Sequence, residues 1–418
     1  MAKTVTLLLA LVGTPLFIVI SALALLSYHG VGIDPSVVII EMTRLADTPL
    51  LISLPLFIFA GTLLSESGTP TRILKLSHLF LGWLPGGLAV MSLSVCAVFT
   101  AFTGASGVTI VALGGILLPA LIKDGYSDRF SLGLITSSGS LGLLFPPSLA
   151  LILYGVVAEV RIDHLFLAGV IPGFLMLLML SSYAVKSGAQ AARPRKTELS
   201  DISSILRETM WEIPLPFIII IGIYGGFLVA GEAAAVTALY VIVVEVFIYR
   251  DVSLRQLPDI MGRSMVLFGG ILIILAASMA STNYFIDQQI PSKLFDIIKT
   301  YIDSKYTFLI LLNVFLLIVG AFLDIFSALV LIVPLILPIA AGYDINPIHL
   351  GIIFLTNLQI GYCTPPVGLN LFLASYRFER PILQLYRASL PFLGLLLITL
   401  ALITYFPWLS LALIDWLG

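Results

Sequence analysis

Long stretches without an acidic or basic side chain alternate with short charged segments along most of the chain. Five of the uncharged stretches are about as long as one membrane crossing or somewhat longer: residues 4–28, 130–158, 165–185, 264–286 and 388–414. A helix needs roughly 20 apolar residues to cross the hydrocarbon core of a bilayer. The pattern therefore predicts membrane helices over these stretches.

Two further apolar regions are too long for a single crossing. Residues 79–122 contain no acidic or basic side chain, and residues 325–376 contain only Asp344. Each region must fold back at least once, and backbone inside a bilayer is tolerated only as helix or where protein or water receives its polar groups. We therefore expect helical hairpins that turn inside the membrane, at about residues 88–122 and 307–341.

Composition agrees with a membrane protein. Of 418 residues, 59% are hydrophobic and 11% are charged, and the mean hydropathy is +1.11, whereas an ordinary globular domain has about 25% charged residues. The net charge of −2 indicates no basic surface for nucleic acid. The central segment, 186–210, carries Arg193, Arg195 and Lys196. By the positive-inside tendency we expect an extended, cytoplasmic loop there.

The two halves of the chain repeat one pattern. In the first, TGASGVTIVALGGILLPALIKDGY (103–126) is followed by a helix and by LGLLFPPSLALILYG (141–155). In the second, GAFLDIFSALVLIVPLILPIAAGY (320–343) is followed by a helix and by IGYCTPPVGLNLFLAS (360–375). Such self-similarity, here at an offset of about 218 residues, indicates repeated units. It divides the protein into a first half, 1–185, the central charged loop, 186–210, and a second half with a final helix, 211–418.

Adjacent prolines stand at the same place in both halves, at 146–147 and 365–366. Proline removes a backbone donor and clashes with the carbonyl one turn back, so each pair predicts a helix broken at membrane depth, over about 130–158 and 347–376. Corresponding broken helices in two halves are typical of secondary transporters, whose substrate and ion sites lie near the midplane. Glycines and hydroxyl side chains flank the breaks: Gly142, Ser148, Gly361, Thr364 and Gly368.

The turn of the first expected hairpin, TGASG (103–107), consists of small residues and hydroxyls. Small residues also serve close helix packing, but here they lie in the middle of an apolar region that must turn. The hydroxyls of Thr103, Ser106 and Thr109, with backbone carbonyls, suit a hard monovalent cation, because hard cations prefer oxygen ligands.

The second half has Asp324 at the equivalent position, as the only carboxylate between residues 307 and 343. A carboxylate within the membrane is costly and indicates a functional site; a helix-end residue that reaches water is the alternative. Asn357, Gln359 and Asn370 surround the second break, where uncharged polar groups could recognise a substrate carboxylate or hold a loop.

The combination resembles the large membrane subunit of tripartite ATP-independent periplasmic (TRAP) transporters. The resemblance lies in the pairing of the GASG hairpin with LGLLFPPS and of the FLD hairpin with IGYCTPPVGLNLF, and extends to SLPLFIFAG (53–61), LPGGL (84–88) and LFLAGVIPG (165–173). It implies an all-α integral membrane protein with an elevator-type ion transporter fold, in which two inverted repeats each contain a re-entrant helical hairpin and a broken helix. Gln359 is a departure, because many members carry Glu there.

The resemblance also implies a function. The chain would be a multi-pass protein of the bacterial inner membrane that imports a small organic acid with sodium ions. A periplasmic substrate-binding protein would deliver the substrate, and a small four-helix membrane subunit would join the scaffold. The first sodium site would involve Thr103, Ser106, Gly142 and Pro146, and the second would involve Asp324, Thr364 and Gly368. The candidate substrate-binding residues are Ser106, Ser148, Asn357, Gln359 and Asn370.

Two other functions fit part of the sequence. GASG (104–107) has the G-x-S-G pattern of rhomboid-like intramembrane serine proteases, in which a serine nucleophile needs a histidine base; His349 is the histidine that lies within an apolar stretch. This reading leaves the repeat and both proline pairs unexplained. A passive anion channel could use the same hairpins, but the chain has no obvious filter motif and its duplication favours alternating access. We therefore expect a transporter rather than an enzyme.

Overall fold

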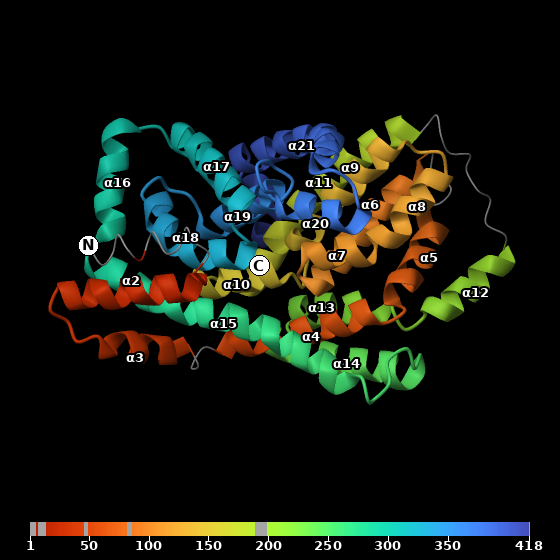
Figure 1. Ribbon diagram of the computed structural model, residues 1–418, viewed down its shortest axis with the longest axis horizontal. Coiled ribbons are helices and arrows are strands. Elements are labelled where there is room, and N and C mark those ends of the chain that lie inside the picture. The colour runs from red at the N-terminus through yellow and green to blue at the C-terminus, as the bar shows by residue number, and fades with distance from the viewer. Residues whose placement is uncertain (1–5, 7–13, 46–48, 82–85, 189–198, 418) are drawn as a thin grey trace.

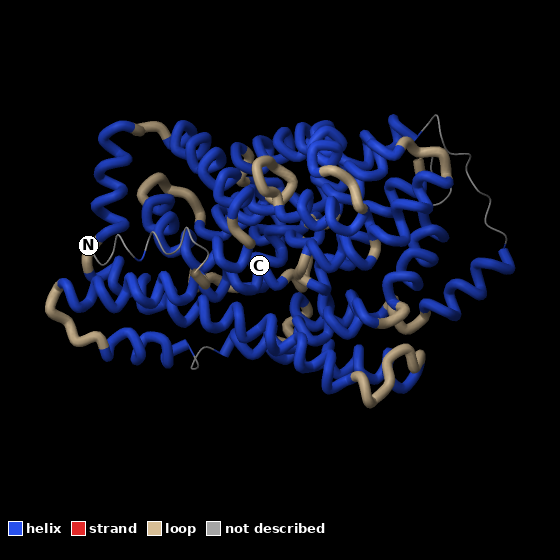
Figure 2. The backbone as a smooth tube through the Cα atoms, in the orientation of Figure 1, coloured by secondary structure: helices blue, strands red, loops and turns tan. Residues whose placement is uncertain are grey.

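The computed structural model describes residues 6, 14–45, 49–81, 86–188 and 199–417. These residues are almost entirely helical, and no strand occurs among them (Figure 2). The helices form two layers that are joined at opposite ends by two connecting helices (Figure 1). The all-helical prediction is confirmed.

The lower layer in Figure 1 is called the scaffold layer here. It is organised around α15 (Leu257–Asp287), against which α2, α3 and α4 pack, while α14 packs on α4. Its other helices are α2 (Leu16–Gly30), α3 (Ser36–Arg44), the short η2 (Pro49–Ile52), α4 (Ser53–Glu66), α13 (Pro214–Tyr224) and α14 (Ala230–Ile242), which continues as the π-helix η4 (Val243–Ile248).

The upper layer is called the hairpin layer. The first half contributes α6 (Gly87–Thr103), α7 (Ser106–Ala112), α8 (Gly114–Lys123), α9 (Asp128–Ser138), η3 (Leu141–Leu144), α10 (Leu149–Val157) and α11 (Ile162–Gly188). The second half contributes α17 (Lys305–Phe322), α18 (Ile325–Ala341), α19 (Pro347–Gly361), α20 (Leu369–Phe378), α21 (Ile382–Tyr405) and α22 (Trp408–Leu417).

Two helices connect the layers. Helix α5 (Thr69–Leu81) runs from the end of α4 to the first hairpin, and α16 (Ile290–Tyr301) runs from the end of α15 to the second (Figure 1). Each therefore joins a scaffold helix to a hairpin. They are called the arm helices below.

In the hairpin layer, the two halves pack on each other through equivalent helices. Helix α10, after the first break, packs on α18 of the second hairpin, and α20, after the second break, packs on α7 of the first hairpin. Likewise α9 packs on α21, and α19 packs on α11. This reciprocity is what an inverted repeat produces, because each half presents the same surface to the other.

The breaks lie at the proline pairs, as expected. The peptide bonds Pro146-Pro147 and Pro365-Pro366 are both cis. The axis bends by 46° between the α9–η3 segment and α10, and the second arm of the first hairpin bends by 51° between α7 and α8. Among the described residues, five helices are long and apolar enough to cross a bilayer: Ile162–Ser187, Ala230–Ile248, Leu257–Asp287, Lys305–Phe322 and Ile382–Tyr405.

The central segment differs from the extended loop that we expected. Its basic residues Arg193, Arg195 and Lys196 lie outside the described residues, but the segment ends in a helix, α12 (Leu199–Thr209), that packs on α5. The sequence LSDISSILRET spaces leucine and isoleucine three to four residues apart, which gives one apolar helix face. Of the first apolar stretch, 4–28, α2 covers residues from Leu16 onward, and residues 4, 5 and 7–13 lie outside the described part.

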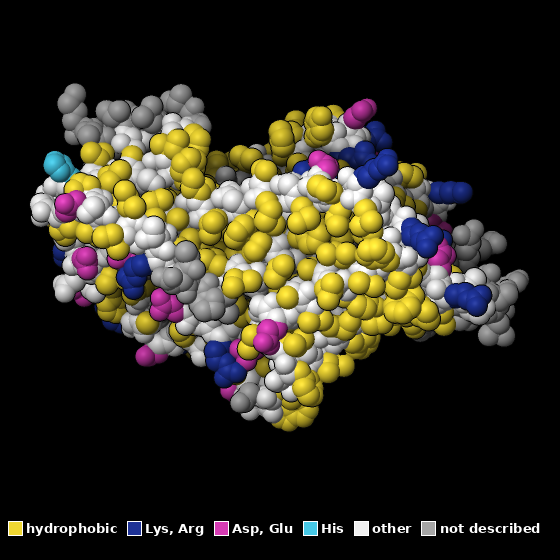
Figure 3. Space-filling model, turned by 90° about the horizontal axis from the view of Figure 1, so that it is seen from below, with side chains coloured by type: hydrophobic (Ala, Val, Ile, Leu, Met, Phe, Trp, Pro, Cys, Tyr) yellow, Lys and Arg dark blue, Asp and Glu magenta, His cyan; other side chains and the backbone are white. Residues whose placement is uncertain are grey.

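The outer surface is rich in hydrophobic side chains. Figure 3 shows them spread over the face seen from below, with charged side chains gathered mainly toward the edges. Large exposed examples on three helices are Leu239 of α14, Val266 of α15 and Leu178 of α11. Because bilayer lipid accepts such a surface without cost, it agrees with a protein embedded in the membrane.

Candidate functional site

The tip of the first hairpin joins α6 to α7 through Gly104 and Ala105. Gly104 has a φ of +65°, and its amide bonds to the carbonyl of Thr100 at 2.8 Å. A Cβ at Gly104 would lie 2.4 Å from the Leu149 side chain of α10, so the tip and the helix after the first break meet closely. The buried hydroxyl of Thr103 has no hydrogen-bond partner within the described structure. The tip thus retains an oxygen that a ligand could use.

The first broken helix packs directly on the backbone of this hairpin. A Cβ on Gly142 of η3 would lie only 2.2 Å from the carbonyl oxygen of Ala97 in α6. One turn before the tip, the Thr100 hydroxyl lies 2.6 Å from the Thr109 hydroxyl and donates to the Gly139 carbonyl at 2.8 Å. The structure therefore brings the tip and the first break together into one unit. Sodium binding there stays a prediction.

Buried side chains with unused hydrogen-bonding capacity lie at the first break and on the helix after the second. Ser148 is fully buried beside the half-buried Pro146, and its hydroxyl has no partner among the described residues. Asn370 donates through Nδ2 to the carbonyl of Thr136 at 3.3 Å, while its Oδ1 is likewise unpartnered. Since Thr136 lies on α9, this bond links the helix after the second break to the helix before the first. Ser106, at the start of α7, is also buried.

Asp324 lies at the tip of the second hairpin, where it caps the N-terminus of α18. Its Oδ1 accepts hydrogen bonds from the amides of Phe326 and Ser327, each at 3.0 Å, and its Oδ2 accepts from the Ser327 hydroxyl. The positive end of the helix dipole stabilises a carboxylate at this position. The side chain is exposed at the protein surface, so it remains accessible to a further ligand.

The second break is tied to the second hairpin by backbone contacts. The amide of Gly368, with a φ of +58°, donates to the carbonyl of Ala321 at 3.1 Å. A Cβ on Gly361 would lie 2.6 Å from the backbone of Gly320. A small cavity of about 180 Å³ lies between α17 and the break and is lined in part by Thr364. The second tip and the second break thus form a unit that matches the first.

Asn357 and Gln359 point away from Asn370. Asn357 donates through Nδ2 to Asn313 of α17 at 2.7 Å, and the Gln359 amide lies 2.7 Å from the sulfur of Met176 in α11. Asn370 instead faces α9. The structure therefore does not gather these three side chains at one point, although Oδ1 of Asn357 and Oε1 of Gln359 are both buried without a partner in the described part.

His349 is fully engaged elsewhere. Its Nδ1 lies 3.1 Å from the hydroxyl of Ser410 in α22, and its Nε2 lies 3.3 Å from the carbonyl oxygen of Thr404 in α21. Neither ring nitrogen is therefore left to activate Ser106. The geometry gives no support to the protease interpretation.

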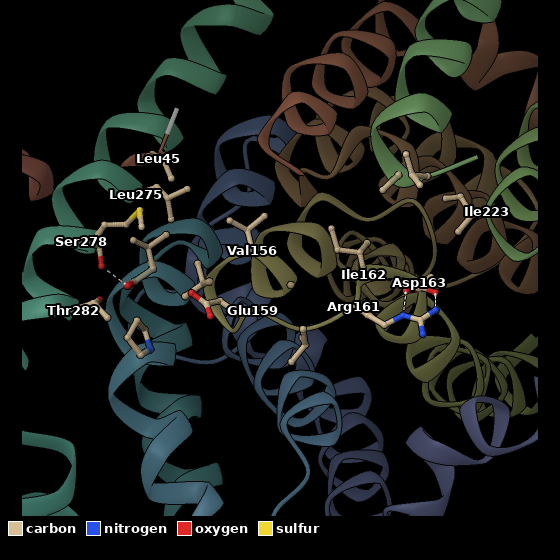
Figure 4. Close-up of a pocket in the computed structure, with 18 of the residues that line it drawn as sticks. Leu45, Val156, Glu159, Arg161, Ile162, Asp163, Ile223, Leu275, Ser278 and Thr282 are labelled. Atoms are coloured by element: carbon tan, nitrogen blue, oxygen red, sulfur yellow. Dashed lines mark hydrogen bonds and ion pairs between the residues drawn. The ribbon is translucent and has the colours of Figure 1, made fainter. Parts of the chain in front are cut away.

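A crevice of about 770 Å³ separates the two layers, and sequence reasoning did not predict it (Figure 4). Scaffold helix α15 forms one wall with Leu275, Ser278 and Thr282. The turn from α10 to α11 forms the opposite wall, on which Arg161 and Asp163 pair with each other. The layers also touch at this crevice, because the Ser278 hydroxyl donates to the carbonyl of Val330 in α18 at 2.6 Å.

A family model described as "Tripartite ATP-independent periplasmic transporter, DctM component" matches residues 3–409. The chain belongs to this TRAP transporter family. A relative from Pseudomonas aeruginosa named "C4-dicarboxylate TRAP transporter large permease protein DctM" is 34% identical over 381 residues, which is 91% of this chain and 89% of the relative. The resemblance seen in the sequence is thus confirmed.

Two other similar proteins extend the comparison. An "Isethionate TRAP transporter permease protein DctMQ" from Oleidesulfovibrio alaskensis is 32% identical over 401 residues, which is 95% of this chain and 63% of that longer protein. The crystal structure of the YdaH transporter from Alcanivorax borkumensis aligns with a TM-score of 0.62 at 15% identity, over 89% of this chain and 86% of YdaH. The similarity to YdaH shows a shared membrane-transporter fold.

Membership settles two expectations and supports a third in part. As a TRAP permease the protein is a transporter and not an enzyme, which leaves the protease interpretation without support. It is a multi-pass protein of the bacterial inner membrane. The family is tripartite by description, which implies a small membrane subunit and a periplasmic binding protein.

Proposed function

We propose that this TRAP permease imports a small organic acid together with sodium ions, by an elevator movement of the hairpin layer along the scaffold layer. The observation that carries the proposal is the pairing of each hairpin tip with the break of its own half. Gly142 lies against α6, and Gly368 is bonded to Ala321 at the end of α17. Two equivalent units of this kind suit two cation sites that enclose a substrate.

Sodium would bind where each tip meets its break. The last carbonyl groups of a helix have no partner within that helix, and hard cations prefer oxygen ligands. The first site would use the Thr103 and Ser106 hydroxyls with backbone oxygens of the Gly142–Pro146 turn. The second would use Asp324 with Thr364 and the backbone near Gly368. These are the residues that the sequence predicted.

The substrate would lie between the two units. Relatives are named for C4-dicarboxylates and for isethionate, and both are small organic anions. Ser106, Ser148 and Asn370 are the candidates best placed to contact such an anion, because they lie at the tip and on the helices that follow the breaks. Asn357 and Gln359 would act from the neighbouring helices and are weaker candidates.

The arm helices support an elevator movement. Each connects one scaffold helix to one hairpin, and the 770 Å³ crevice leaves the layers only partly packed on each other. An elevator movement needs such a division, since one body must slide while the other stays fixed, both within the bilayer. A small four-helix membrane subunit would bind the scaffold layer, and the periplasmic protein would deliver the substrate.

Uptake by purified components tests the proposal. The permease and its small subunit would be reconstituted into vesicles, and uptake of a radiolabelled C4-dicarboxylate would be measured with the cognate binding protein outside. Related organic acids should also be tried, including 2-hydroxyethanesulfonate. Accumulation against a gradient, driven by external sodium, is expected for one of these acids. Downhill equilibration that ignores sodium would instead indicate a passive channel.

A further inference from the structure

A buried group of one arginine and three carboxylates lies where arm helix α5 meets the scaffold layer, away from both hairpin tips. Arg72 of α5 donates from Nε to Glu212 at 2.7 Å, from Nη2 to Glu245 at 2.7 Å and from Nη1 to Asp251 at 2.5 Å. The guanidinium carbon also lies 3.8 Å from the centre of the Tyr249 ring. We call these residues the Arg72 cluster.

The Arg72 cluster has more negative than positive charge. Three ionised carboxylates against one guanidinium would leave a net charge of −2, and a buried charge without compensation is costly. Glu245 is completely buried, and Glu212 is nearly so. No other described lysine or arginine pairs with these carboxylates. Lys75, the next basic residue of α5, pairs with the exposed Glu208 at 2.6 Å instead.

A count of hydrogens leads to the same conclusion without any charge argument. The hydroxyl oxygen of Thr69 lies 3.0 Å from Oε1 of Glu212 and 3.1 Å from Oε1 of Glu245. A hydroxyl has one hydrogen, so it can donate to only one of them. The Ser67 hydroxyl lies 2.8 Å from the Thr69 hydroxyl and 2.9 Å from the carbonyl oxygen of Leu64, so its hydrogen lies in neither of the two contacts with glutamate. The second oxygen–oxygen contact therefore needs a hydrogen on a carboxyl group.

Among the described residues, each of the three carboxyl groups accepts from two donors, but Glu245 is the one that is completely buried. Oε1 of Glu212 accepts hydrogen bonds from Nε of Arg72 and from the Thr69 hydroxyl. Asp251 accepts hydrogen bonds from Arg72 and, at 2.8 Å, from the amide of Gly68. Its side chain is 29% exposed to solvent. Within the described structure, Oε1 of Glu245 has Thr69 as its single partner.

We propose that Glu245 is a proton-binding site: as a carboxylic acid it donates from Oε1 to the Thr69 hydroxyl, which in turn donates to Glu212. Oε2 of Glu245 then accepts from Arg72 as observed. The ligand is a proton, and the cluster holds one more proton than three ionised carboxylates would. This proposal does not depend on the sodium sites or on the identity of the substrate.

The position of the site gives the proton a mechanical effect. Thr69 and Arg72 begin arm helix α5, and Glu245 lies in the π-helix η4 that ends α14. If Glu245 lost the proton, two carboxylates would compete for the single hydrogen of the Thr69 hydroxyl. One hydrogen bond between the arm helix and the scaffold layer would then be lost, and their contact would be weaker. The ionisable groups that face Glu245 are Arg72 of α5, Glu212 before α13, and Tyr249 and Asp251 after η4. Helix α4, which packs on α14, carries Glu66, but that carboxylate pairs with Arg263.

The sign of the pH effect follows from linkage. A carboxyl group that holds its proton more tightly in the folded state stabilises the fold at acidic pH, and this contribution is lost as pH rises through its folded-state pKa. A glutamate in the unfolded chain titrates near pH ~4.3. Thermal stability should therefore fall between mildly acidic and alkaline pH, over a range where an unshifted glutamate no longer changes.

Infrared difference spectroscopy on the full-length protein in detergent tests the proposal. The carbonyl stretch of a protonated carboxylic acid should persist well above the pH of about 4.3 at which an ordinary glutamate titrates, and disappear on titration to alkaline pH. Glu245→Gln replaces the acid with an amide that can make the same two bonds, so it should remove this band and at least halve the pH dependence of the melting temperature. Glu66→Gln, an exposed residue of the same type, should change neither.

Two results would overturn the proposal. One is a titrating band that persists unchanged in Glu245→Gln; the other is a pH dependence of melting that equals that of the unmodified protein. If Glu245→Gln does not fold, Thr69→Val provides the second test, because it removes the hydroxyl that receives the proton. The midpoint of the infrared titration should then shift by at least half a pH unit, and an unmoved midpoint would contradict the assignment.

Discussion

The amide of Gly368 donates a hydrogen bond to the carbonyl oxygen of Ala321 at 3.1 Å. This bond joins the second broken helix to the tip of the second hairpin, as does the bond from the Ile325 amide to the Tyr362 hydroxyl. In the first half, the close contact of Gly142 with Ala97 joins the broken helix to the first hairpin. A backbone group exposed inside a membrane must find a partner in protein, water or an ion. At these two joints, a bound ion can therefore be the partner of backbone carbonyl groups that have no other.

Gly142→Ala should destabilise the protein. The added Cβ would lie 2.2 Å from the carbonyl oxygen of Ala97, which is main chain and cannot rotate away. Overpacking of this kind costs about 1–3 kcal/mol, and the loss should appear as a lower melting temperature and reduced uptake. Gly394→Ala in α21 is the matched control, because a Cβ there meets nothing within 4 Å. Equal melting temperatures for the two variants would show that Gly142 does not pack tightly on the main chain of Ala97.

Ser106→Ala should weaken the dependence of uptake on sodium. The serine is buried at the start of α7, beside the tip where we propose a cation site, and the alanine removes one oxygen while keeping the helix. The sodium concentration for half-maximal uptake should rise several-fold, with expression unchanged. Ser182→Ala in α11 is a control, since the Ser182 hydroxyl bonds only within its own helix among the described contacts. Sodium curves that superimpose would exclude Ser106 as a ligand.

Asp324 has two separable roles, as a cap of α18 and as a proposed ligand. Asparagine caps a helix about as well as aspartate, whereas alanine costs about 1 kcal/mol. Asp324→Asn should therefore melt like the unmodified protein but lose most sodium-driven uptake, because the carboxylate charge is gone. Asp324→Ala should lose both stability and uptake. Near-normal uptake by Asp324→Asn, with the binding protein present, would leave the residue with the capping role alone.

Movement between the layers can be blocked at a known contact. The Ser278 hydroxyl of α15 donates to the carbonyl of Val330 in α18 at 2.6 Å, so a cysteine pair at these two positions, oxidised and checked for disulfide formation, would bridge the layers where they touch. The oxidised double variant should be inactive and recover uptake on reduction, while each single variant should transport. The native Cys96 and Cys363 are buried and should not interfere. Full uptake with the bridge formed would exclude sliding at this contact.

Much of the fold could be predicted because its constraints are local. Local structure follows directly from the uncharged stretches, the proline pairs and the small residues of TGASG, because each of these features determines the conformation of the few residues around it. The helices consequently lie near the expected bounds: α6 to α8 cover the first hairpin, and α17 and α18 cover the second. The repeat strengthened these predictions, since each feature of one half could be checked in the other.

Other features depend on contacts between distant residues. The Arg72 cluster joins positions more than 130 residues apart, so no local pattern indicates the partners of Arg72. One signal was available: Glu245 is an isolated carboxylate next to an apolar stretch, the same reason that drew attention to Asp324. The directions of Asn357 and Gln359 also could not be predicted, because all faces of α19 are buried and the sequence shows no preferred one.

In the proposed transport cycle, sodium and the substrate enter in one event. The direct test is to measure radioactive sodium and a labelled organic acid together in the same reconstituted vesicles, with and without the binding protein. Sodium entry should rise in a fixed ratio to substrate entry, require the binding protein, and be lost in Asp324→Asn. Substrate accumulation without accompanying sodium entry, or sodium entry that is the same when substrate is absent, would contradict it.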